Sequence, residues 1–329
     1  MNVPLPETDL AEIAVCLLGR HDQSIGAAEL LGRGEQSVCY GAGDFAVLLQ
    51  HSAEPVPDVR QSNSYPVQQW MSWLAGQAAV HTVEFIASGD DPLPYAVMRR
   101  IHGRTAAEIE QSADAQRAAW LHAMAAEVRK INSVRVEGFG EVVATAEGYR
   151  GRYNSWAAYL DACIAKYLLQ GPLSHDDVAV RDALLGQGIV STAHLERIAA
   201  QLETAKGWGT EPVLVHYDNR LANLVVEGNR IALVDWGLSY AGIGLPQELV
   251  KVTEAPDAPP PYLPMHAFLE GYGVPEGDWP VAIERGTLML VLDGLMMTHS
   301  WASADTESYL GGIRGWLTSI RRICDEARY

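Results

Sequence analysis

The chain has 329 residues, a hydrophobic content of 48% and a formal net charge of −17. A chain of this length is more than one small core serves, and its apolar content excludes global disorder. The negative charge argues against binding to nucleic acid or to anionic membranes and favours a cationic small molecule as a partner.

Cysteine usage and the lack of export signals predict a cytoplasmic protein. The first twenty residues have no basic n-region, and the most apolar window, Thr287–Met297, is too short to span a bilayer and predicts a buried helix. The four cysteines are widely spaced and form no C-x-x-C pair. We therefore expect reduced thiols and no metal site built on cysteine.

The first hundred residues have the pattern of a small sheet. A helix is expected from about Asp9 to Gly19. Glycines break short apolar runs over Ala28–Gln50, which predicts three strands with tight turns. Val67–Gly76 has helical spacing, and His81–Gly103 predicts two more strands around an Asp-Asp-Pro turn. Residues 1–100 are thus expected to form a small N-terminal lobe of five strands and an inserted helix.

The rest of the chain is mainly helical in pattern. Amphipathic helices are predicted over Ser112–Val134, Ser155–Gln170 and Thr192–Gly207. The segment GYRGRYNSW (Gly148–Trp156) is expected to be a surface loop. The sequence therefore predicts an α+β protein in which residues 101–329 form a larger helical lobe.

Polar residues cluster in the segment VLVHYDNRLANLVVEGNRIALVDWG, residues 213–237. Asp218 follows one apolar strand, Asn223 comes five residues later, and a second apolar strand leads to Asp235. Strands around the intervening Glu-Gly-Asn turn would bring the three side chains to one edge of a hairpin. Asn223 and Asp235 supply the one or two oxygen ligands that Mg²⁺ usually takes from protein. Asp218 is then left to accept a proton from a hydroxyl.

This segment resembles the catalytic and metal-binding loops of the aminoglycoside phosphotransferase and choline kinase superfamily, which share the pattern H-x-D-x-x-x-x-N and a later Asp. GRGEQSVCYGAGDFAVLLQ occupies the place of the phosphate-covering hairpin, and YAVMRRIHGRT resembles the passage that ends the nucleotide lobe. GEQS, EGFG and SWAAYL are most similar to hygromycin B phosphotransferases. The resemblance implies a bilobal protein-kinase-like fold with a small N-terminal antiparallel sheet lobe and a larger, mainly helical C-terminal lobe.

The resemblance also implies a reaction and a set of site residues. The donor would be ATP or GTP, the cofactor Mg²⁺, and the acceptor a hydroxyl of a small, cationic molecule, first of all an aminoglycoside or a related antibiotic, in resistance or self-protection. Asp218 would be the base and Asn223 and Asp235 the metal ligands, with His216 holding the loop by hydrogen bonds and Trp236 packing beneath Asp235. The nucleotide would contact, at its phosphates or at its base, Gly34, Glu35, Gln36, Ser37, Met98, Arg99 and Ile101.

The sequence departs from the family at the phosphate-binding ion pair. The third strand, FAVLLQ, puts Leu48 or Leu49 where the family has a Lys or Arg, and the helix YPVQQWMSWL has no acid to pair with one. The family's Asp in a later G-D-P segment is Leu245 here.

Two hypotheses follow from this departure, and a third concerns the acceptor. In the first, another cation serves, and Arg220 is preferred to Arg33 or Arg60. In the second, the chain is a catalytically silent, kinase-like protein that only binds a ligand. In the third, the enzyme acts on a metabolite such as choline, a sugar or an amino alcohol.

Overall fold

The computed structural model describes residues 7–34, 37–50, 63–109, 114–165, 191–209, 211–252 and 263–303. They belong to two compact units. The first unit contains residues 7–34, 37–50, 63–109 and 221–237. The second contains residues 114–165, 191–209, 211–220, 238–252 and 263–303.

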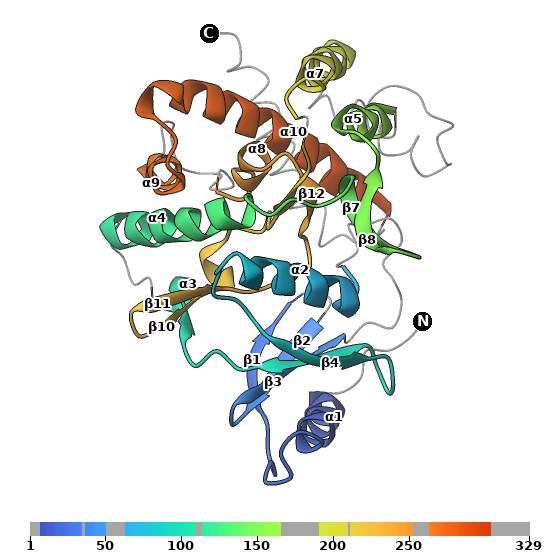
Figure 1. Ribbon diagram of the computed structural model, residues 1–329, viewed down its shortest axis with the longest axis vertical. Coiled ribbons are helices and arrows are strands. Elements are labelled where there is room, and N and C mark those ends of the chain that lie inside the picture. The colour runs from blue at the N-terminus through green and yellow to red at the C-terminus, as the bar shows by residue number, and fades with distance from the viewer. Residues whose placement is uncertain are drawn as a thin grey trace. The chain divides into compact units, whose positions relative to one another are not determined.

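A five-stranded antiparallel sheet forms most of the first unit, in the order β1-β2-β3-β5-β4 (Figure 1). Its strands are β1 (Glu29–Arg33), β2 (Ser37–Ala42), β3 (Phe45–Gln50), β4 (Phe85–Gly89) and β5 (Tyr95–Arg99). The longer helices of this unit are α1 (Glu7–Gly19) and α2 (Tyr65–Gln77). The five strands and the inserted helix are those expected from the sequence, although α1 begins two residues earlier than expected.

The register of β3 places the two leucines at the family's expected cation position on opposite faces of the sheet. Leu49 is fully buried with Val47 and Val97 in the core that α1 covers. Side chains alternate along a strand, so Leu48 lies on the opposite face. There its ladder partners are Cys39 and Ala96.

A second sheet of the first unit, β11-β10-β6, carries part of the candidate site. Its elements and the short helices next to them are β6 (Arg104–Thr105), α3 (Ala106–Ile109), η2 (Leu221–Asn223), β10 (Leu224–Glu227) and β11 (Arg230–Leu233). The hairpin of β10 and β11 turns at Gly228, whose φ is +59°. The boundary at residues 100/101 stays a prediction; β10 pairs with β6 and therefore groups with the first unit.

The second unit combines helices with a four-stranded sheet in the order β8-β7-β12-β9. Its strands are β7 (Phe139–Thr145), β8 (Gly148–Tyr153), β9 (Val213–Val215) and β12 (Tyr240–Gly242). Its helices are α4 (Asp114–Ile131), α5 (Trp156–Ile164), α7 (Thr192–Ala205), α8 (Leu245–Glu248), α9 (Leu263–Tyr272), η3 (Glu276–Asp278) and α10 (Trp279–Ser303). The predicted helices are present within the described residues; the end of the one expected to reach Gln170 lies outside them.

The segment expected to be a loop, residues 148–156, is instead mostly strand β8. It pairs with β7 along its length, and Arg152 Nη2 lies 2.7 Å from Glu141 Oε2 of that strand. Glycines and arginines give the segment a loop-like composition, but the backbone pairing needs no apolar pattern. Gly138 and Gly140 hold left-handed conformations, with φ of +69° and +82°, next to an irregular register in β7.

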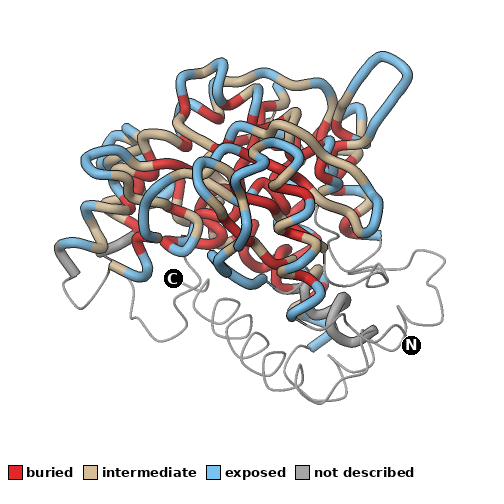
Figure 2. Tube along the Cα trace, turned by 90° about the horizontal axis from the view of Figure 1, so that it is seen from below, coloured by how far each residue is buried: buried red, intermediate tan, exposed pale blue. Residues whose placement is uncertain are grey.

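The core of the second unit lies under β9 and β12. Trp156, Tyr217 and Val250 are buried there with residues 288–292 of α10, which confirms the buried helix. Figure 2 shows the described chain coloured by burial, with buried segments in red and exposed segments in pale blue. Within the described ranges, no helix combines the length and the apolar content needed to cross a membrane.

Candidate functional site

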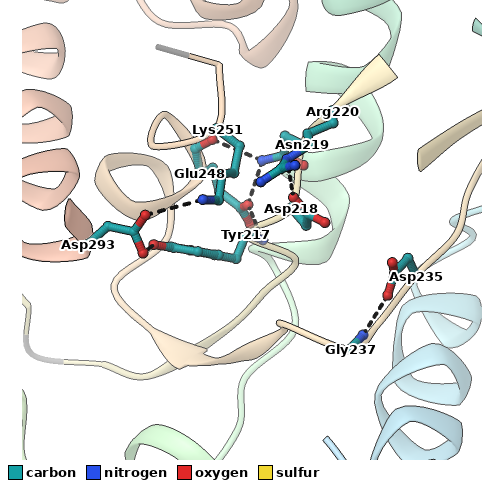
Figure 3. Close-up of polar contacts among 9 residues, drawn as sticks. All are labelled: Tyr217, Asp218, Asn219, Arg220, Asp235, Gly237, Glu248, Lys251 and Asp293. Atoms are coloured by element: carbon teal, nitrogen blue, oxygen red, sulfur yellow. Dashed lines mark hydrogen bonds and ion pairs between the residues drawn. The ribbon is translucent and has the colours of Figure 1, made fainter. Parts of the chain in front are cut away.

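The loop after β9 carries Asp218 in a tight backbone path. The backbone N–H of Asp218 donates to the carbonyl of His216 at 2.9 Å, and that of Arg220 donates to the carbonyl of Asp218 at 2.8 Å. Tyr217 has a φ of +73°, in the left-handed region that non-glycine residues rarely adopt. Asp218 is 8% exposed, and its Oδ1 lies 2.9 Å from Nε of the half-exposed Arg220 (Figure 3).

Glu248, at the end of α8, binds this loop through hydrogen bonds to its carboxylate. Its carboxylate accepts the backbone N–H groups of His216 and Tyr217, at 3.0 and 2.8 Å. It also accepts the side-chain amides of Asn132 and Asn219, both at 2.7 Å. A fully buried carboxylate is costly unless its oxygens are satisfied, and here three donors from the loop and one from Asn132, just after α4, satisfy them. Figure 3 shows Glu248 with Tyr217 and Asn219 of the loop.

Burial dominates the electrostatics of Glu248. It raises the pKa of this carboxyl above its ordinary value, and the four hydrogen bonds act in the opposite direction. Burial is the main cause that raises the pKa of the Tyr272 hydroxyl, and the nearby charge of Glu248 is the second. This hydroxyl donates to Asn132 Oδ1 at 2.9 Å. A largely buried polar cluster thus supports the Asp218 loop.

His216 is placed to hold the loop. Its side chain is fully buried, and its carbonyl accepts the hydroxyl of Ser239 at 3.0 Å as well as the N–H of Asp218. These contacts are made by the backbone, so the structural role expected for the His216 side chain and its direct participation in the reaction both stay predictions.

Asn223 and Asp235 flank the same end of the β10–β11 hairpin in the first unit. Leu224 pairs with Leu233, and the N–H of Val234 donates to the carbonyl of Asn223 at 3.0 Å. The structure thus brings these two residues together, as the hairpin argument expected. Asp218 follows β9 of the four-stranded sheet and belongs to the second unit.

The backbone around Asp235 is fixed on both sides. Asp235 is exposed and left-handed, with a φ of +66°, and its Oδ1 accepts the N–H of Gly237 at 3.0 Å (Figure 3). Trp236 is fully buried, as expected, and its indole N–H donates to Thr82 at 2.8 Å. Asn63 binds the carbonyls of Trp236 and Gly237, at 3.1 and 2.8 Å.

Hard oxygen donors of Asn223 and Asp235 fit a magnesium ion, which needs few ligands from the protein. Among the described residues, no group of three or more His, Cys, Asp or Glu side chains could hold a metal. A site at this hairpin end would therefore rest on the two predicted ligands.

The expected nucleotide contacts are partly described. Gly34 donates its N–H to the carbonyl of Ser37 at 2.8 Å, which closes the turn between β1 and β2; Glu35 and Gln36 lie outside the described residues. Met98 is buried, Ile101 is half-buried, and Arg99 instead covers the ring of Phe45 at 5.0 Å from its centroid. All seven contacts stay predictions.

The residues expected at the positions of the family's ion pair carry no charge. Leu48 offers no charge, and Gln68 donates its amide to the carbonyl of Asn63 at 2.7 Å. Tyr65, at the start of α2, is buried, and burial raises the pKa of its hydroxyl, with smaller contributions from Cys39 and Asp235. Tyr65 therefore stays a neutral donor in the neighbourhood of Asp235. Arg60, one of the alternative cations, lies outside the described residues, and Arg33 is exposed on β1.

Glu248 is the residue that the sequence reasoning missed. The family motif directs attention to the position of Leu245, where an acid is absent, although the chain supplies an acid three residues later. A glutamate inside segment 241–250, whose other residues are all uncharged, was the available signal.

These two units have the α+β, bilobal kinase-like fold of the antibiotic kinases. The phosphotransferase enzyme family model matches residues 41–280, and the chain belongs to this family of enzymes. In sequence, no curated protein matches the chain.

Solved structures agree in fold at low sequence identity. The aminoglycoside phosphotransferase APH(4)-Ia, in a ternary complex with AMP-PNP and hygromycin B, has a TM-score of 0.66 and 17% identity over 95% of this chain and 98% of that one. The gentamicin complex of APH(2")-IIa has a TM-score of 0.59 and 13% identity over 97% and 99%. A choline/ethanolamine kinase family protein from Mesorhizobium loti has a TM-score of 0.50 and 16% identity over 96% and 99%.

Proposed function

We propose that this phosphotransferase moves the γ-phosphoryl group of ATP or GTP to a hydroxyl of a small, cationic molecule, most of all an aminoglycoside or a related antibiotic. The observation that carries the proposal is the Asp218 loop. Backbone hydrogen bonds and the four-donor Glu248 cluster hold the loop, and its nearly buried carboxylate contacts the adjacent Arg220. Such a loop suits a base that must be in place before its substrate arrives.

Two groups of residues act in this scheme. Asp218 orients the acceptor hydroxyl and takes its proton as the phosphoryl group is transferred. Asn223 and Asp235 hold Mg²⁺, which when bound neutralises charge on the phosphates. Five residues separate Asp218 from Asn223, so their Cα atoms can be no more than about 18 Å apart, which keeps both within reach of one triphosphate.

Arg220 is the proposed substitute for the absent strand cation. Its guanidinium is half-exposed and already lies at the candidate base. A planar, permanently charged group is suited to phosphate oxygens. The turn at Gly34–Ser37 is proposed to cover the phosphates, and Met98–Ile101 to contact the base.

The charge of the chain supports the choice of acceptor. A net charge of −17 attracts polycations, and two of the similar structures hold hygromycin B or gentamicin. Antibiotic resistance or self-protection would be the biological use. A cytoplasmic location is proposed with it, because the donor nucleotides are found there.

Leu48 favours one alternative: a kinase-like protein that binds nucleotide without transferring phosphate. Loss of one preorganised charge partner costs about 3–4 kcal/mol of transition-state stabilisation. The choline/ethanolamine kinase family likeness favours a second alternative, a metabolite kinase acting on an amino alcohol or a sugar.

A two-stage assay separates these functions. Thermal stabilisation by Mg-ATP and Mg-GTP is measured first, and mass spectrometry then detects phosphorylated products from a panel of aminoglycosides, choline, ethanolamine and sugars. We expect stabilisation and a mass gain of one phosphate on an aminoglycoside. Product only from an amino alcohol or a sugar would support the metabolite kinase, and stabilisation without any product would support the silent protein.

A further inference from the structure

A buried polar network, which the proposed reaction does not use, lies beneath the Asp218 loop. The hydroxyl of Tyr217 donates to Asp293 Oδ1, and Nζ of Lys251 lies 3.2 Å from Asp293 Oδ2. The ammonium also lies 5.7 Å from the centroid of the Tyr217 ring. Figure 3 shows the Tyr217 ring reaching from the loop to Asp293, and Lys251 alongside the ring with its ammonium joined to Asp293.

These three residues are deep in the core of the second unit. The side chains of Lys251 and Asp293 are 3% and 1% exposed, and Tyr217 belongs to the same apolar cluster as Leu292 of α10. A buried ion pair is weak evidence for stability, because apolar residues of similar volume are often as stabilising. The network therefore calls for another explanation.

The backbone of Tyr217 supplies that explanation. Its φ of +73° is a conformation in which glycine has no steric penalty and tyrosine does. The residue is held there from two directions, by the N–H bond to Glu248 at 2.8 Å and by the side-chain bond to Asp293. The next residue in the chain is Asp218, so the conformation of Tyr217 sets the direction in which Asp218 leaves the loop.

We propose that Tyr217 is a positioning residue for Asp218, and that Asp293 and Lys251 fix it to α10 and to the segment after α8. The inference rests on the proposed function, because it gives Asp218 the role of base. The hydroxyl bond and the neighbouring ammonium hold the ring, and the ring holds the left-handed backbone. Asp218 then meets its substrate in one orientation.

The test compares Tyr217→Phe with Tyr159→Phe. The first variant removes only the hydroxyl that binds Asp293. The second removes a hydroxyl from another tyrosine of the same cluster, whose ring packs on Trp156 of α5. We expect Tyr217→Phe to lower kcat by about 10- to 100-fold, the effect of losing a hydrogen bond to a charged group, with an unchanged KM for the nucleotide. Tyr159→Phe should keep the wild-type kcat.

A second measurement does not depend on turnover. Hydrogen–deuterium exchange of peptides that cover residues 213–220 reports the order of the loop in each folded variant. We expect faster exchange there in Tyr217→Phe and wild-type exchange in Tyr159→Phe.

The two measurements separate failure of the inference from failure of the proposed function. Unchanged loop exchange in Tyr217→Phe overturns the positioning role, and so does faster exchange with a wild-type kcat. A lowered melting temperature with normal exchange and kcat would make the network merely structural and also overturn it. If the wild type transfers phosphate to no acceptor, the function fails, while loop exchange still decides whether Tyr217 orders the Asp218 loop.

Discussion

At the scale of single residues, Glu248 shows how a buried charge can organise a loop. Its carboxylate accepts hydrogen bonds from two backbone and two side-chain donors. Removal of the carboxylate would leave these donors buried and unsatisfied, and removal of a donor would leave a carboxylate oxygen less satisfied. The position of Asp218 thus depends on a residue thirty positions later in the chain.

The raised pKa of Glu248 predicts how stability changes with pH. Because the folded state holds this proton more tightly than the unfolded state, the contribution is fully present below about pH 4.3, the ordinary pKa of glutamate, and is lost as the pH rises through the folded value. Gln at this position does not titrate. Thermal melts across this pH range should therefore show the stability of the wild type falling relative to Glu248→Gln. A difference that stays constant or grows with pH would contradict the prediction.

Asp235 should determine the response to metal. If it is a ligand of Mg²⁺, Asp235→Ala should lose most of the Mg-dependent part of nucleotide stabilisation, which reaches about 2.7 kcal/mol when the ligand is at a hundred times its Kd. Asp90→Ala, which changes an exposed acid in the β4–β5 turn of the same unit, is the control. Thermal shifts with and without Mg²⁺ measure both, and equal shifts would remove Asp235 from the metal site.

At the scale of elements, the pairing of β6 with β10 depends on close backbone approach. A Cβ at Gly103 would lie 2.3 Å from the carbonyl oxygen of Val226, whereas a Cβ at Gly76 of α2 would meet nothing within 4 Å. We expect Gly103→Ala to destabilise the fold by about 1–3 kcal/mol. Gly76→Ala should be neutral or stabilising by up to about 1 kcal/mol. Chemical denaturation measures both, and equal stabilities of the two variants would contradict this account of the pairing.

Elements with strong periodicity were predictable, and those that depend on distant partners were not. The alternation in the first sheet and the spacing of the helices gave the right elements, and the Glu227–Asn229 turn placed Asn223 and Asp235 together. β8 was wrongly expected to be a loop because its glycines and arginines hide the pairing with β7. The ties of Glu248 and Asp293 to the loop join residues far apart in sequence, which no local pattern encodes.

At the scale of the whole molecule, the catalytic candidates are close in sequence but belong to two different compact units. Arg220 is the last residue of a stretch of the second unit, and Leu221 begins a stretch of the first. The fold itself persists at 17% identity to an antibiotic kinase, so the fold does not determine the acceptor.

The central claim is that Asp218 is the base of a magnesium-dependent phosphotransfer, and turnover of Asp218→Ala with the acceptor found in the panel tests it most directly. Asp161→Ala, which changes an exposed acid on α5 of the same unit, is the control. We predict that Asp218→Ala loses turnover by about 10²- to 10⁴-fold while its thermal shift with Mg-nucleotide stays that of the wild type. Wild-type turnover in Asp218→Ala would contradict the claim.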